Sequence, residues 1–182
     1  MKKLVVAVVG LAGSGKSEVA KVFEETGFVR VRFGDVTDEE VTRRGLMLNE
    51  SSERLVRESL RKEYGMAAYA KLNLPRMDAA LERAGVVADG MYSWEEYLLM
   101  KEYYGASFRV VAVWASPETR YRRLSARPVR PLTLEEARSR DKSEIENTNK
   151  SGPIAMADYL IVNEGTLEDL RAQAKKIAAE LK

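Results

Sequence analysis

Short apolar runs alternate with amphipathic segments along the whole chain. Five of the runs have the length and composition of β-strands: residues 3–9, 28–33, 85–89, 108–115 and 158–162. The first is apolar throughout, as expected for a strand that is buried on both faces of a sheet. Because helical patterns separate the runs, the chain predicts an α/β fold with a five-stranded parallel sheet covered on both faces.

The segments between the strands carry the signals of helix ends. Four longer helices are expected at residues 50–64, 66–84, 134–146 and 167–181. Asn49 or Ser51 is the candidate cap of the first, and Thr166 that of the last. Pro75 lies inside the second and is expected to kink or split it, since proline removes a backbone hydrogen bond.

Two long insertions enlarge this plan. One spans about 35–84, between the second and third strands, and the other about 120–156, between the fourth and fifth. We find no repeat, low-complexity tract or linker, so one domain over residues 1–182 is expected. Insertions on both sides of a crevice at the carboxyl edge of the sheet could close over two substrates and exclude water. We interpret the first as acceptor-binding and the second as a lid.

The turn after the first strand carries the most specific signal. Gly10-Leu-Ala-Gly-Ser-Gly-Lys-Ser17 matches the phosphate-binding pattern G-x-x-x-x-G-K-[ST], with a strand before it and a helix after it. Its glycines allow the N–H groups to form an anion nest, Lys16 can reach the β- and γ-phosphates, and the Ser17 hydroxyl can bind Mg²⁺. We therefore expect a three-layer P-loop NTPase fold that binds ATP and Mg²⁺. The residues expected at the nucleotide are Gly10, Ala12, Gly13, Ser14, Gly15, Lys16, Ser17, Glu18, Arg123, Asn163 and Gly165.

Acidic residues end the second and third strands. Asp89 is expected to hold Mg²⁺ directly or through water, or alternatively to terminate its strand in an Asp-Gly turn. Asp35 should lie near Asp89, because parallel strands present their carboxyl ends at one edge. It could orient the acceptor, accept its proton or join the Mg²⁺ water shell; the alternative is a helix cap.

Arginines gather in the second insertion. Arg120, Arg123 and Arg127 have the spacing of one helical face, and Arg130, Arg138 and Arg140 follow. Guanidinium groups suit phosphoryl oxygens, although a solvated basic helix is the alternative. We assign catalytic roles to Lys16, Asp35, Arg123 and Arg127, and expect Asp141 to pair with an arginine of the lid. Candidates for a phosphate on the acceptor are Arg43, Arg44 and Arg57. The loop from Asn163 to Thr166 lies beside an adenine or is only a helix-entry turn.

Composition narrows the function classes. The net charge of +2 gives no global electrostatic case for nucleic acid, which we do not expect as a partner. The chain has no cysteine and no histidine, so proton transfer must use Asp, Glu, Lys or water. No apolar stretch approaches ~18 residues, so we expect no membrane contact and a cytoplasmic location. A small-molecule phosphoryl acceptor and a monomer or homodimer are the expected partners.

Together these residues resemble the nucleoside monophosphate kinase group of P-loop proteins. Dephospho-coenzyme A kinases have a similar Gly13-Ser-Gly-Lys-Ser17 loop and a C-terminal pattern like Ala157-Asp-Tyr-Leu-Ile-Val-Asn-Glu-Gly165. An uncharacterised, mainly archaeal family related to adenylate kinase is nearer still. It shares stretches similar to Phe33-Gly-Asp35, Arg44-Gly-Leu46, Glu63-Tyr-Gly65 and Asp89-Gly90. The resemblance implies an ATP-dependent kinase with a nucleotide-like acceptor.

The chain departs from these families at three positions. Adenylate kinases place an arginine a few residues after the Asp-Gly pair, where Met91-Tyr92-Ser93 stand here, and Asp38 replaces a second expected arginine. Both changes disfavour a nucleoside monophosphate acceptor. Glu18 stands where dephospho-coenzyme A kinases usually carry threonine.

Two other function classes stay open at this point. A P-loop NTPase with a regulatory or nucleic-acid-associated role would hydrolyse ATP slowly without a small acceptor. A nucleotide-binding protein without catalysis is disfavoured, because Lys16, Ser17, Asp35 and Asp89 are all present.

Overall fold

A five-stranded parallel sheet forms the centre of the structure, a computed structural model that describes residues 4–128 and 131–181. Its strands are Val5–Val9 (β1), Val29–Arg32 (β2), Val86–Asp89 (β3), Phe108–Trp114 (β4) and Tyr159–Val162 (β5), in the order β2-β3-β1-β4-β5. All five predicted strands are confirmed. The expected start of the first, at Lys3, lies outside the described residues.

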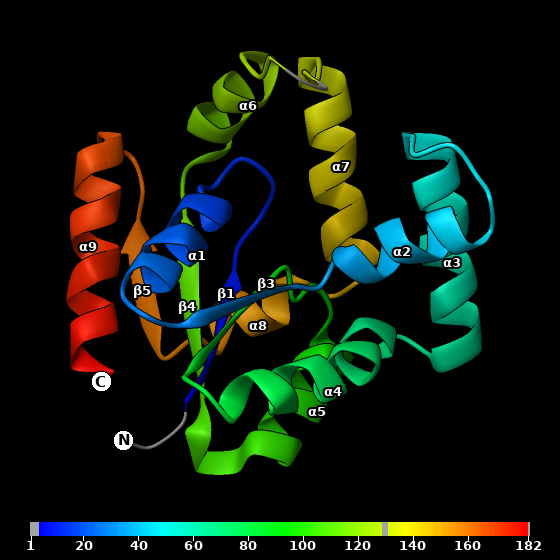
Figure 1. Cartoon of the computed structure of the whole chain (residues 1–182). Helices are drawn as coiled ribbons and strands as arrows, with labels where there is room; N and C mark the ends of the chain where they lie inside the picture. The colour runs from blue at the N-terminus through cyan, green and yellow to red at the C-terminus, as the bar shows by residue number, and fades with distance from the viewer. Residues whose placement is uncertain (1–3, 129–130, 182) are drawn as a thin grey trace.

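Helices cover both faces of the sheet, so the fold is a three-layer α/β/α arrangement, as expected (Figure 1). The helices are Lys16–Glu25 (α1), Asp35–Arg43 (α2), Glu50–Tyr64 (α3), Ala68–Leu81 (α4), Trp94–Tyr104 (α5), Pro117–Ser125 (α6), Leu134–Glu146 (α7), Ser151–Ala155 (α8) and Leu167–Glu180 (α9), with a 3₁₀ turn at Gly105–Ser107. The helices α1 and α9 pack against one face, and α4, α5 and α8 lie on the other.

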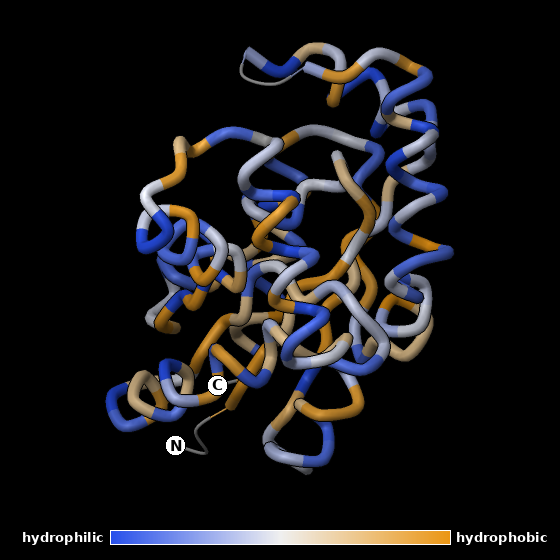
Figure 2. The backbone as a smooth tube through the Cα atoms, turned by 90° about the vertical axis from the view of Figure 1, so that its right-hand side faces the viewer, coloured by the Kyte–Doolittle hydropathy of each residue, from blue (hydrophilic) through white to orange (hydrophobic). Residues whose placement is uncertain are grey.

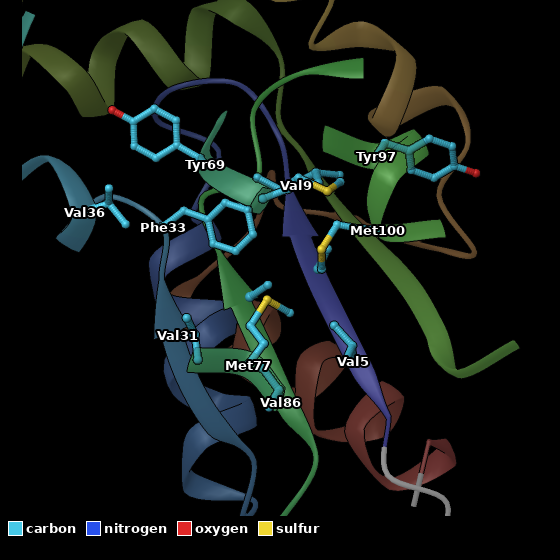
Figure 3. Packing of buried hydrophobic residues seen from close by; sticks show 14 of the residues in the cluster. Val5, Val9, Val31, Phe33, Val36, Tyr69, Met77, Val86, Tyr97 and Met100 are labelled. Carbon is cyan, nitrogen blue, oxygen red and sulfur yellow. The ribbon is translucent and has the colours of Figure 1, made fainter. Parts of the chain in front are cut away.

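Alternation along β1 explains the two cores. Val5, Ala7 and Val9 point to the side of α4 and α5, whereas Val6 and Val8 point to α1 and α9; all five are fully buried. Figure 2 shows several hydrophobic (orange) segments running through the middle of the molecule. In the first core, side chains from α4 and α5 close over those of the strands (Figure 3).

Local signals set most helix ends. Asn49 caps α3 by accepting a hydrogen bond from the backbone N–H of Ser52, and Thr166 caps α9 in a capping box, both as predicted. The alternative that Pro75 splits the helix is wrong, since α4 continues through it, while a kink there stays a prediction. Pro75 is on the exposed side of α4, where water can bond the carbonyl that loses its helical partner.

The two insertions supply helices both to one face of the sheet and beyond its carboxyl edge. The first contributes α2, α3 and α4, and the second contains most of α6 together with α7 and α8. Figure 1 shows α6 and α7 beyond the end of β1, with α2 and α3 to one side. Within the described residues, no helix is both long and apolar enough to cross a membrane.

Candidate phosphate-binding site

The phosphate loop joins β1 to α1 in a conformation that only glycine adopts readily. The φ angles of Gly10, Gly13 and Gly15 are 152°, 81° and 103°. A Cβ atom at Gly10 would collide with the Val113 carbonyl oxygen, and one at Gly15 would lie 2.5 Å from Asn163 Nδ2. The loop therefore forms the close-fitting backbone cradle that phosphate binding requires.

A cleft of about 180 Å³ opens in front of this loop. Its lining residues are Gly13, Gly15, Lys16, Ser17, Glu18, Arg123 and Arg127. All seven are among the residues predicted from the sequence. Five come from the phosphate loop and the start of α1, and the two arginines come from the second insertion. The arrangement places three cationic side chains around one anion nest, which suits a polyphosphate.

Lys16 holds the centre of the cleft. Its Nζ donates a hydrogen bond to the Leu11 carbonyl oxygen at 2.8 Å, within the loop itself. Burial of the ammonium group, followed by the positive charge of Lys150, lowers the pKa of Lys16 to about 7. A bound phosphate would therefore favour the charged form of Lys16, which burial disfavours in the empty site.

Nucleotide binding is therefore expected to take up protons. Because phosphate oxygens raise the pKa of Lys16 above about 7, binding is strongest below that pH and weakens as the pH rises. At about pH 8.5, titration calorimetry in two buffers of different ionisation enthalpy should show uptake approaching one proton. Glu96→Gln is the control, since burial also raises the pKa of Glu96 to about 7. Proton release in both proteins would contradict this prediction.

Asn163 fastens the cradle from the end of β5. Its Nδ2 donates to the Ser14 carbonyl oxygen at 2.7 Å, and Arg123 Nη1 donates to the Asn163 carbonyl oxygen at 3.0 Å. Asn163 thereby supports the loop, while its role toward adenine stays a prediction. Gly165 lies in the turn before α9, where a Cβ would come within 2.7 Å of the capping Asp169 carboxylate.

Three further predicted positions lie in or just after the loop. Ala12 and Ser14 are buried beneath the cradle, and the Ser14 hydroxyl has no hydrogen-bond partner among the described residues. Glu18 forms an ion pair with Arg171 of α9, although it also lines the cleft. The contact of these positions with a nucleotide stays a prediction, and Glu18 also links α1 to α9.

Both predicted acidic residues are paired with arginines of β2. Asp89 Oδ2 accepts hydrogen bonds from Arg30 at 2.5 and 3.1 Å, and Asp35 lies 3.0 Å from Arg32. The exposed Ser17 hydroxyl and the Asp89 carboxylate are hard oxygen donors of the kind Mg²⁺ uses together with substrate phosphates. Within the part of the chain described, no three acidic side chains form a metal cage. The residues fit Mg²⁺ brought in with a nucleotide.

The arginines of the second insertion separate into two roles. Their expected common helical face is wrong, because α6 ends at Ser125, before Arg127. Arg127 precedes Pro128, and a proline disfavours the helical conformation in the residue before it. Arg123 and Arg127 line the cleft, whereas Arg120 turns inward and forms hydrogen bonds of 2.8 and 2.5 Å with both carboxylate oxygens of Asp141. The predicted pairing of Asp141 is confirmed.

Three of the remaining arginine candidates are held by carboxylates, and a fourth lies outside the described residues. Arg43 and Arg44 both bond Glu40 at 2.6 Å, and Arg57 lies 3.4 Å from Glu53. Arg130 lies outside the described residues. Their contact with an acceptor phosphate stays a prediction.

The structure also shows a group of buried charges that the sequence did not indicate. Lys150 and Glu144 lie 2.8 Å apart, next to Tyr92 and close enough to Lys16 to affect its pKa. Lys150 lies in a connection between two helices, so no periodic pattern marked it. Its position at the return of the lid to the sheet edge is the signal that could have done so.

The fold and the loop define the class: an α/β protein with the P-loop kinase fold. A family described as an AAA domain matches residues 6–149. A UPF0200 protein of Thermococcus kodakarensis is 38% identical over 98% of both chains. The chain belongs to the UPF0200 family.

Two solved structures show the same fold. Shikimate kinase from Bacteroides thetaiotaomicron has a TM-score of 0.60 at 15% identity and covers 98% of each chain. Dephospho-CoA kinase from Campylobacter jejuni has a TM-score of 0.56 at 15% identity, covering 100% of this chain and 99% of its own. At this identity the likeness establishes the architecture alone.

Proposed function

We propose that the protein is an ATP-dependent kinase that transfers the γ-phosphoryl group to a small, nucleotide-like acceptor. The observation that carries the proposal is the cleft itself, where the glycine cradle, Lys16 and two arginines converge. The similarity of the fold to that of solved kinases supports a phosphotransferase rather than a passive nucleotide-binding protein. We place the acceptor beside the helices of the first insertion, α2, α3 and α4.

Positioning and charge neutralisation would account for most of the catalysis. The loop N–H groups and Lys16 would bind the donor phosphates, and Arg123 and Arg127 would stabilise charge on the group being transferred. Mg²⁺, held by Ser17 and by Asp89 directly or through water, would neutralise phosphate charge. No covalent enzyme intermediate is needed.

Asp35 is our candidate for the acceptor side. It begins α2, the first helix of the acceptor insertion, and its ion pair with Arg32 is largely exposed. A carboxylate there would suit an acceptor hydroxyl, such as the ribose of dephospho-coenzyme A, by orienting it or accepting its proton. A phosphate acceptor would instead depend on arginine contacts.

The test is ADP release from Mg²⁺-ATP with a panel of acceptors. The panel contains the nucleoside monophosphates, dephospho-coenzyme A and a control without acceptor. We expect one acceptor to stimulate release and to yield a phosphorylated product by mass spectrometry. Equal, slow release in every sample, combined with stimulation by a macromolecular partner, would favour the regulatory NTPase instead.

A further inference from the structure

Lys150 is a buried cation at the centre of the charge group beside the phosphate loop. It is 1% exposed, and its Nζ lies 2.8 Å from Glu144 Oε2 on α7 and 4.2 Å from the centre of the Tyr92 ring. Burying an ammonium group has a large desolvation free energy, which packing alone would not offset. Its surroundings point to a binding role.

One carboxylate serves two cations in this group. Arg140 Nε bonds the other Glu144 oxygen at 3.1 Å, so Lys150 and Arg140 hold Glu144 between them. Burial opposes the ionisation of Glu144, but Lys150, Arg140 and Lys16 together outweigh it and hold the pKa of that carboxyl below its ordinary value. Glu144 is therefore an anion with one cation on each carboxylate oxygen.

Positive charge still predominates around the cleft. Among the charged neighbours of Lys16, Lys150 has the largest effect on its pKa. The Asp89 carboxylate accepts hydrogen bonds from Arg30. The nearby Glu96 is fully buried, and its Oε2 accepts the backbone N–H groups of Tyr92 and Ser93. Further negative charge at this point would be stabilised, as phosphoryl oxygens would supply.

The charge group lies at the carboxyl edge of the sheet. Tyr92 follows Asp89 at the carboxyl end of β3, and β3 is the neighbour of β1, which leads into the phosphate loop. Lys150 lies over the Tyr92 ring and is therefore at the carboxyl edge of the sheet, beside the strand that pairs with β1. Lys150 is buried and does not line the open cleft, so a phosphate would reach it when Glu144 moves aside.

We propose that Lys150 binds the phosphoryl group at the transfer point, and that Glu144 takes the place of that group when the site is empty. Substrate oxygens would replace the Glu144 carboxylate on Lys150 and Arg140. Because Glu144 and Arg140 belong to α7, the exchange would also report substrate arrival to the lid. This inference rests on the proposed kinase function.

The experiment uses variants with opposite expected signs. Lys150→Ala should weaken binding of a non-hydrolysable ATP analogue by about tenfold while changing ADP binding less than about twofold. Glu144→Gln should strengthen binding of the analogue, because it removes the competing negative charge. Lys142→Ala and Glu146→Gln are the matched controls, since this pair on the same helix is exposed and 4.0 Å apart. Titration calorimetry measures all four.

A second arm locates the source of the phosphate. With ADP saturating, AMP and inorganic phosphate are titrated into wild type and Lys150→Ala. Selective loss in this arm also supports the proposal and assigns the phosphate to the acceptor. Loss of affinity that is equal for the analogue and ADP, with no change in the second arm and no gain in Glu144→Gln, would overturn it. Failure of the wild type to bind either nucleotide would instead reject the kinase proposal.

Discussion

Replacing Lys16 with methionine is expected to reduce phosphoryl transfer at least ~100-fold, the cost typical of losing one preorganised donor to developing charge. Lys16 is the loop cation that can reach the β- and γ-phosphates, and its neighbours Arg123 and Arg127 enter the cleft from the lid side. Neither arginine can take its position inside the loop, where Lys16 bonds the Leu11 carbonyl oxygen. ADP formation with the acceptor found in the panel measures the effect.

Lys21→Met is the matched control for this substitution. Lys21 is an exposed lysine of the same helix, so the control makes the same side-chain replacement without touching the cleft. We expect full activity in Lys21→Met. A Lys16→Met protein that kept more than a tenth of wild-type turnover would refute the assigned role of Lys16 and the loop mechanism with it.

The same substitution should not destabilise the empty protein. The ordinary pKa of Lys16 is 10.5, and burial lowers it to about 7 in the folded state. The unfolded chain therefore binds more protons between these values, so stability rises with pH across that window and the charged lysine disfavours folding near neutral pH. An uncharged methionine side chain at this position removes the conflict. Thermal unfolding of Lys16→Met at neutral pH should occur at or above the wild-type temperature, as at other functional sites that trade stability for activity.

Local patterns predicted the frame of the site. The apolar run before Gly10 predicted a buried strand, and the glycine spacing predicted the nest, because both depend on neighbouring residues. Caps such as Asn49 and Thr166 were predictable for the same reason. These features need no knowledge of distant parts of the chain.

Long-range contacts explain what the sequence could not predict. Arg120 belonged by composition to a phosphate-binding group, yet its Nη1 atom bonds the Ala12 carbonyl oxygen, 108 positions away. No sequence pattern marked Lys150, because its surroundings are formed by Tyr92 and Glu144 from other parts of the chain. In both cases tertiary packing, which spacing along one helix does not determine, decides what the cation binds.

Loss of the Arg120 side chain is expected to give the largest change in stability. Arg120 bonds both oxygens of Asp141 on α7 and the carbonyl oxygen of Ala12, and the two charged side chains are only 4% and 11% exposed. Removing one member of such a buried pair leaves the other charge uncompensated, at a cost of about 3–5 kcal/mol. Denaturant unfolding of Arg120→Ala should show this decrease in the free energy of unfolding.

Two comparisons separate the buried charge from other causes of instability. Arg54→Ala breaks an exposed pair with Glu58 at 2.9 Å and should cost less than about 1 kcal/mol. In Arg120→Met with Asp141→Leu, no charge is left unpaired, so much of the lost stability should return. Because Arg120 also ties the phosphate loop to α7, this double variant should stay impaired in nucleotide binding although it is folded. A double variant as unstable as Arg120→Ala would show that the hydrogen bond to Ala12, rather than the charge of Asp141, dominates the cost.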